Sequence, residues 1–159
     1  MPEAHPRGSR FAVATLSTSI FLLTALAVAL AQGSQEGATT TGVSTGVYTS
    51  EQAERGAEVF LTSCAGCHGP ELQGGFGPQL APLGEHWLGG SLGSLYSFVS
   101  SAMPYSAPGS LEPQQYADVL AFVLQENGYQ AGDAELVPDA EALAAFTFDT
   151  PAEGADDED

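Results

Sequence analysis

Cys64 and Cys67 are the only two cysteines of the chain, and His68 follows the second one directly. Two thiols and an imidazole this close together, in the stretch CAGCH, can support four kinds of chemistry. They can form a local disulfide, supply part of a zinc site, act as a thiol redox pair, or anchor a haem covalently. The surrounding sequence discriminates between these alternatives.

The first three alternatives each lack something that the sequence would have to supply. A disulfide between cysteines three positions apart closes a short loop and removes little entropy from the unfolded chain. A thiol redox motif is typical of a helix start after a β-strand, whereas a helical pattern precedes Cys64. A zinc site takes four ligands, and beyond His68 the only histidine outside the first thirty-one residues is His86. A secreted thiol or zinc module is therefore a remote alternative.

The spacing C-x-x-C-H predicts one covalently attached haem c. Each thiol would add across one vinyl group of the macrocycle, and His68 would be the proximal ligand of the iron. Met103 is the only methionine besides Met1, and we expect its thioether to occupy the other axial position, where it raises the reduction potential relative to a second imidazole. A methionine that merely fills the core is the alternative role, and His86 is the rival ligand.

The first thirty-one residues are predicted to be a signal peptide. Arg7 and Arg10 precede an uncharged apolar run over residues 11–31, which closes on the small-x-small pattern ALA. The alternative is an uncleaved membrane tether through the same run, because about 20 apolar residues can span a bilayer. In both cases the protein is exported, to the periplasm or the outer face of the cytoplasmic membrane, where covalent haem attachment takes place.

Composition divides the rest of the chain into three parts. Residues 32–47 are rich in Gly, Ser and Thr and predict a flexible linker. Residues 48–130 hold most of the aromatic side chains and all of the candidate chemistry, and they predict the folded domain. Residues 131–159 form a C-terminal extension, and its acidic end from residue 149 predicts a solvated tail.

Apolar spacing predicts three helices in the central part and no strand. The first begins at Thr49 or Ser50 and runs into Cys64. The second covers residues 92–102 and ends because the residue before Pro104 avoids the α region. The third covers residues 113–126, with a proline in its first turn and Asn-Gly after its end. A weak fourth helix is expected over residues 139–146, so the predicted class is all-α.

These motifs together resemble the class I cytochromes c over roughly residues 48–130. The matches run in order as Gly56-x3-Phe60-x3-Cys64-x2-Cys67-His68-Gly69, then Gly77-Pro78-x-Leu80, Trp87, Met103-Pro104, and the helix with Tyr116, Leu120 and Phe122. The resemblance implies a small fold of about three to five helices around one haem. It also implies an electron carrier between redox partners rather than an enzyme in its own right.

The resemblance further implies two contacts. Gly56 would admit the aromatic ring of Phe122 where the first and last helices cross. The carbonyl of Pro78 would accept a hydrogen bond from the ring nitrogen of His68 that does not face the iron. The stretches MPYSAPGSL and NGYQAG resemble a bacterial subset found beside quinoprotein alcohol dehydrogenases, although Gln130 stands where that subset has proline.

The charge of the chain bears on its partners. The formal net charge is −17, and the sequence contains no lysine. Such a surface repels nucleic acid and anionic membranes. It favours a redox partner with a basic docking patch, such as a dehydrogenase, a cytochrome complex or a terminal oxidase. A free carrier and a fixed electron-transfer subunit of a dehydrogenase or oxidase both satisfy the sequence.

Overall fold

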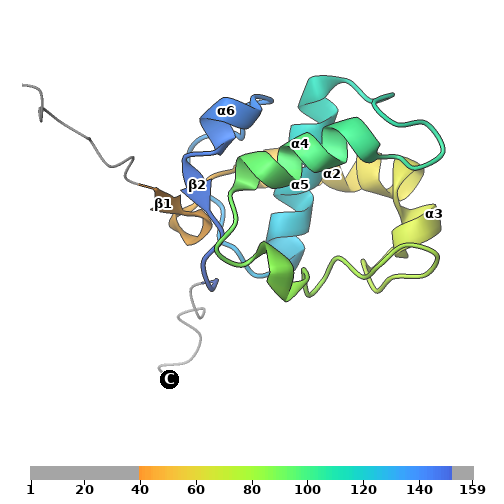
Figure 1. The fold of residues 1–159 in the computed structure, drawn as a ribbon, viewed down its shortest axis with the longest axis horizontal. Helices are drawn as coiled ribbons and strands as arrows, with labels where there is room; N and C mark the ends of the chain where they lie inside the picture. The colour runs from red at the N-terminus through yellow and green to blue at the C-terminus, as the bar shows by residue number, and fades with distance from the viewer. Residues whose placement is uncertain (1–39, 152–159) are drawn as a thin grey trace, which may run out of the picture. The chain divides into compact units, whose positions relative to one another are not determined.

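The computed structural model describes residues 40–151 (Figure 1). The predicted signal peptide or tether, most of the predicted linker and the end of the acidic tail lie outside the described residues. Within the described residues the longer helices are α2 (Ser50–Ser63), α4 (Leu92–Ala102) and α5 (Pro113–Glu126). The short helices are α3 (Ala65–His68), α6 (Ala140–Leu143) and the 3-10 turns η1 (Val43–Thr45) and η2 (Glu85–Trp87). None of the helices in this part of the chain is long and apolar enough to cross a membrane.

The three predicted helices are confirmed, because local signals fix their ends. The Thr49 side chain accepts a hydrogen bond from the Gln52 amide and caps α2, and Ser91 caps α4 in the same way. Helix α5 begins with Pro113, where the missing N–H costs nothing. The helical class is confirmed, and the helices account for nearly all of the regular structure.

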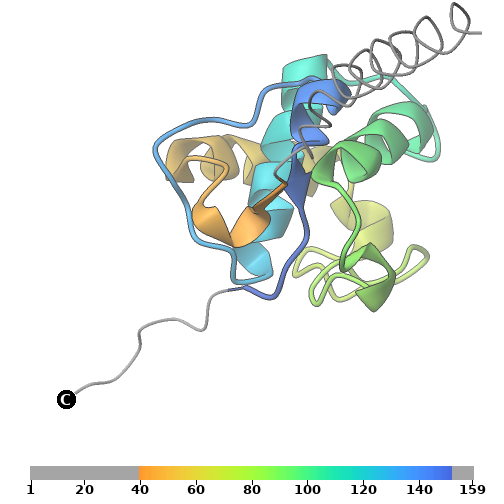
Figure 2. The same cartoon turned by 60° about the vertical axis from the view of Figure 1, so that its left-hand side comes forward.

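Helices α2 and α5 cross at Gly56, as the resemblance implied (Figures 1 and 2). A Cβ atom at Gly56 would overlap the backbone carbonyl of Asp118 and lie 3.0 Å from the Cβ of Phe122. The rings of Phe60 and Phe122 then meet beside the crossing, with centroids 5.2 Å apart and planes tilted by 53°. Glycine is needed here because the two backbones approach too closely for any side chain.

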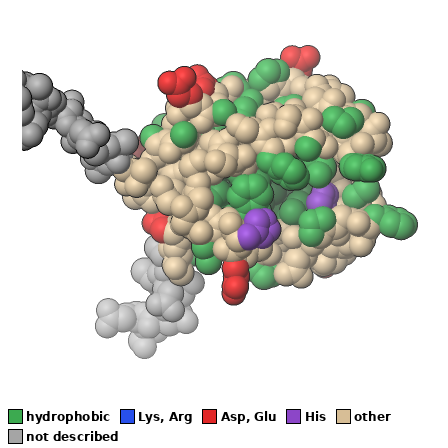
Figure 3. Space-filling view, viewed as in Figure 1, with side chains coloured by type: hydrophobic (Ala, Val, Ile, Leu, Met, Phe, Trp, Pro, Cys, Tyr) green, Lys and Arg blue, Asp and Glu red, His purple; other side chains and the backbone are tan. Residues whose placement is uncertain are grey.

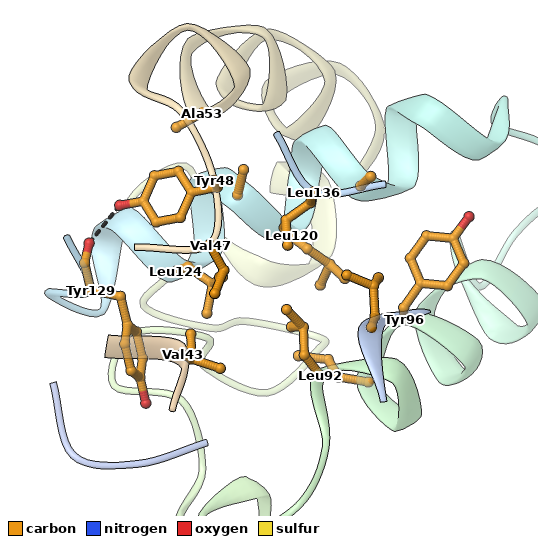
Figure 4. Close-up of a cluster of buried hydrophobic side chains, with 14 of the residues drawn as sticks. Val43, Val47, Tyr48, Ala53, Leu92, Tyr96, Leu120, Leu124, Tyr129 and Leu136 are labelled. Carbon is orange, nitrogen blue, oxygen red and sulfur yellow. Dashed lines mark hydrogen bonds between the residues drawn. The ribbon is translucent and has the colours of Figure 1, made fainter. Parts of the chain in front are cut away.

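The predicted linker differs from the structure at its C-terminal end. Thr41–Gly42 form strand β1, which pairs in parallel with strand β2, Phe146–Thr147. Val43 is fully buried and Val47 is 7% exposed in the main core (Figure 4). Few apolar residues stand in this stretch, but both valines are buried because a segment about a hundred residues later covers them. The short strand also ends α6 early, so the expected helix over 139–146 is limited to Ala140–Leu143.

A buried polar cluster joins the C-terminal extension to the α2–α5 crossing. Gln52 is fully buried; its amide nitrogen donates to Asp118 Oδ1 and to the Leu136 carbonyl, and its oxygen accepts from the Leu136 amide. Asp118 also accepts from Arg55 Nε at 3.2 Å and from Gln114 at 2.9 Å. The extension is therefore fixed by specific hydrogen bonds to the helices, in addition to apolar packing.

Candidate functional site

A cavity of about 890 Å³ is lined by the five residues that were predicted to hold or orient a haem. Cys64, Cys67, His68, Pro78 and Met103 all line it, together with apolar side chains from α4 and α5. Figure 3 shows the hollow on one face, surrounded by hydrophobic side chains, with histidine at its edge. The structure therefore brings together residues that lie up to 39 positions apart in the sequence.

The two cysteines lie at the junction of α2 and α3. Cys64 ends α2 and is partly buried, whereas Cys67 is exposed, and no disulfide joins them. Burial, with a smaller contribution from Cys67, raises the pKa of the Cys64 thiol to about 11. A redox-active thiol needs a lowered pKa, because the thiolate is the reactive form. The environment of Cys64 therefore disfavours the thiol-redox alternative.

The ring of His68 is held in a defined orientation. Its Nδ1 lies 2.8 Å from the carbonyl oxygen of Pro78. A carbonyl oxygen only accepts hydrogen bonds, so Nδ1 donates and carries a proton, and in the neutral ring this leaves the lone pair of Nε2 to bind a metal. A Cβ atom at Gly77 would lie 2.7 Å from Cε1 of the ring. Glycine at this position therefore leaves the space that the imidazole occupies.

The loop after His68 is folded back onto α3 by backbone hydrogen bonds. The amide of Gly77 donates to the Cys67 carbonyl at 2.9 Å, and the amide of Leu80 donates to the Leu72 carbonyl at 2.8 Å. The side chain of Asn127, just after α5, fixes the far end of this loop. Its amide nitrogen donates to the Leu80 carbonyl at 2.7 Å, and its oxygen accepts from the Leu83 amide. These bonds set the position of Pro78 and hence of the His68 ring.

Met103 lines the cavity from a different element, at the end of α4. Its amide donates to the Val99 carbonyl at 3.0 Å. Its own carbonyl accepts two hydrogen bonds, from the Tyr116 hydroxyl at 2.8 Å and from the Gly109 amide at 3.1 Å. In the sequence Tyr116 stands out only as a residue of the last predicted helix, and this contact was not predicted. The available signal was its hydroxyl, because a buried tyrosine usually finds a hydrogen-bond partner.

The residues around the cavity fit a haem better than they fit a bare metal ion. No Asp, Glu, Lys or Arg is among the residues that line it, and its volume is typical of a cofactor site. A mostly apolar wall with two thiols, an imidazole and a thioether matches an apolar macrocycle with an iron centre. Within residues 40–151 no group of three or more His, Cys, Asp and Glu could hold a metal ion. The zinc alternative thus gains no support.

The rival ligand His86 lies on η2, at the rim of the same cavity. It is exposed, and its ring contacts Trp87 with centroids 5.0 Å apart. The ring of Trp87 in turn packs against that of Phe98 of α4, with centroids 6.2 Å apart, and all three rings line the cavity. Both His86 and Met103 line the cavity, but they approach it from different elements.

The comparisons with known proteins agree with this geometry. Residues 53–127 match the model of the family described as cytochrome c. The CcoP subunit of the cbb3-type cytochrome c oxidase from Cereibacter sphaeroides is 35% identical over 106 residues, which cover 57% of this chain and 36% of that relative. The chain therefore matches about a third of that relative's length, and no solved structure is significantly similar. The C-x-x-C-H motif and all of the residues that line the cavity thus lie within the stretch that is similar to the cytochrome c family.

Proposed function

We propose that the protein is a single-haem c-type cytochrome that transfers one electron at a time between redox partners outside the cytoplasm. Cys64 and Cys67 would hold the porphyrin through two thioether bonds, and His68 and Met103 would be the ligands of its iron. The bound haem supplies the one-electron couple. The observation that carries the proposal is that both thiols, the oriented imidazole and the thioether line one uncharged cavity.

The contribution of the polypeptide is to bind, orient and shield the haem. Pro78 keeps the proton on Nδ1 of His68 and so directs Nε2 into the cavity. Apolar side chains of α2, α4 and α5, among them Phe60, Leu95 and Val119, limit access of water. With His68 and Met103 both bound to the iron, no ligand position would be left for a substrate, which favours the role of a carrier.

The partner would be recognised in two ways. The net charge of −17 would draw a partner with a basic docking patch over long range. The cavity lining contains no charged residue, and Phe76 and Tyr105, which line it, are 100% and 86% exposed. Contact at the opening would therefore be apolar. We expect salt to slow the approach of the partner without abolishing the final contact.

A fixed subunit of a larger redox complex is the second candidate. The similarity to CcoP, a subunit of a cbb3-type oxidase, favours a place beside an oxidase. A place beside a quinoprotein alcohol dehydrogenase rests on the stretch MPYSAPGSL alone. Mild solubilisation of native membranes, followed by affinity purification, separates the two roles. A subunit elutes with a large catalytic chain at constant stoichiometry, and a free carrier elutes alone.

The haem itself is tested by expressing the protein in a host that attaches haem to exported proteins. Mass spectrometry should find one porphyrin covalently added to the peptide that contains Cys64 and Cys67, and it also reports the mature N-terminus. Reduced-minus-oxidised spectra should show a low-spin c-type band. The replacement Met103→Ala should open one axial position to carbon monoxide. Both sulfurs free, or joined to each other, in native protein would refute the proposal.

A further inference from the structure

The segment after Met103 forms an exposed wall of the cavity. Helix α4 ends at Ala102, and residues 105–110 are all exposed before α5 begins at Pro113. Several of them are Ser, Gly or Pro, so few side chains can pack against the core. Backbone hydrogen bonds such as that from the Gly109 amide to the Met103 carbonyl, 3.1 Å, close this loop on itself. They do not attach it to the rest of the protein.

The Tyr116 hydroxyl provides that attachment. It donates to the Met103 carbonyl at 2.8 Å and accepts from the Leu111 amide at 3.3 Å. One oxygen atom therefore bonds to both ends of the 103–111 loop. Tyr116 is 3% exposed and stands in the first turn of α5, whose helix is packed against α2. The position of Met103 is thereby tied to the most extensively packed pair of helices in the described fold.

We propose that Tyr116 is a positioning residue for Met103, which holds the thioether at the cavity and so controls how tightly it stays on the iron. The inference rests on the proposed function, since it takes Met103 to be the axial ligand. Without the hydroxyl, the Leu111 amide loses this partner and the Met103 carbonyl keeps only a bond from its own loop. The loop can then move away from the cavity without separating α4 from α5.

A second tyrosine offers a matched control. Tyr96 of α4 is 7% exposed, and its hydroxyl donates to the Pro113 carbonyl at 3.2 Å. The variant Tyr96→Phe therefore also removes a buried tyrosine hydroxyl, and it weakens the contact between α4 and the start of α5. It leaves both hydrogen bonds of Tyr116 in place. A general loss of stability affects both variants, whereas a loosened Met103 is specific to Tyr116→Phe.

The experiment compares the haem-loaded wild type, Tyr116→Phe, Tyr96→Phe and Met103→Ala. Carbon monoxide is titrated into each reduced protein, and the reduction potential is measured in parallel. Tyr116→Phe should bind carbon monoxide about tenfold more tightly than the wild type, the change that one ordinary hydrogen bond produces, and its potential should fall. Tyr96→Phe should match the wild type in both measurements.

The outcomes separate the two proposals. If Met103→Ala opens the iron while Tyr116→Phe and Tyr96→Phe behave alike, the inference about Tyr116 is wrong and the proposed ligand stands. If Met103→Ala leaves carbon monoxide binding unchanged, Met103 is no ligand and both fail. Amide exchange of the wild type gives an independent check should Tyr116→Phe not load haem. The Leu111 amide should exchange more slowly than that of Ser106 in the same loop, and equal rates would overturn the inference.

Discussion

The carboxylate of Asp149 is hydrogen-bonded to Ser44, which lies 105 residues earlier in the chain. The Ser44 amide donates to one carboxylate oxygen at 3.0 Å, and the Ser44 hydroxyl donates to the other at 2.6 Å. The Tyr129 hydroxyl also donates to the backbone carbonyl of Asp149 at 2.6 Å. Together with the pairing of β1 and β2, these bonds fasten the two flanks of the domain to each other.

Acid should weaken this fastening. Burial raises the pKa of Asp149, but the hydrogen bonds from Ser44 outweigh burial and hold that pKa below its ordinary value of 3.8. A depressed carboxyl pKa stabilises the fold above the unfolded pKa and loses that effect as pH falls through the folded pKa. The free energy of unfolding, measured in urea from pH 7 to pH 3, should fall more steeply for the wild type than for Asp149→Asn. At pH 7 the variant should lose about 1 kcal/mol.

Ser44→Ala is the matched control for this effect. It removes the hydroxyl donor but keeps the amide donor, so the acid dependence should lie between those of the wild type and Asp149→Asn. Identical slopes for all three proteins would contradict the role of this pair.

The C-terminal extension should be needed for stability. Leu136, Leu143 and Phe148 are each 3% exposed or less, and the side chain of Gln52 depends on Leu136 for hydrogen bonds. Ending the chain at residue 130 removes all of these contacts. We expect a loss of several kcal/mol, because burial of each large apolar side chain contributes about 1.5–3 kcal/mol. Ending the chain at residue 151 keeps every described contact and serves as control. Equal urea midpoints for the two truncations would refute the prediction.

Gly56→Ala should be strongly destabilising. The added methyl group would overlap the Asp118 carbonyl, and a backbone group of a packed helix cannot move aside. The expected loss is about 3 kcal/mol or more, at the upper end for overpacked cores. Gly66→Ala is the control, since a Cβ atom there meets nothing within 4 Å. Thermal unfolding of both variants shows whether the loss of stability comes from the steric overlap or from any glycine-to-alanine change. Similar melting temperatures would argue against the close crossing of α2 and α5.

Asn127→Ala should loosen the loop that positions His68. The variant removes two hydrogen bonds to that loop, one to the Leu80 carbonyl and one from the Leu83 amide. We expect a loss of about 2 kcal/mol, because partly buried backbone groups lose their partners. Gln125→Ala, at an exposed position two residues earlier in the last turn of α5, is the control. Urea unfolding measures the loss, and a result equal to that of Gln125→Ala would rule out a role for Asn127 in holding the loop.

The parts of the fold that the sequence predicted are those with local signals. Caps at Thr49 and Ser91 and the prolines at 104 and 113 fix helix ends through neighbouring residues. The burial of Val43 was not predictable in this way, because its partners are distant in sequence and its own surroundings are polar. The C-x-x-C-H motif could be predicted because, like the helix ends, it depends only on residues that are neighbours in the sequence.

The supporting residues of the candidate site were harder to predict. Tyr116 fits the apolar stripe of α5, and Asn127 fits a helix end. Both descriptions are correct, yet neither shows where the hydroxyl or the amide points, since that depends on how α4 and the 69–83 loop are packed around α5. Phe98 shows what apolar spacing alone cannot tell: it stands three residues after the buried Leu95 but is 49% exposed at the cavity.

The paired strands β1 and β2 have a practical consequence. Figure 1 shows them at the opposite end of the described fold from α3. A fluorophore, an electrode linker or a fused enzyme joined at residue 40 or at residue 151 would therefore sit away from the opening beside α3. Immobilised in this orientation, the protein would present that opening to solution, which suits voltammetry on a modified surface.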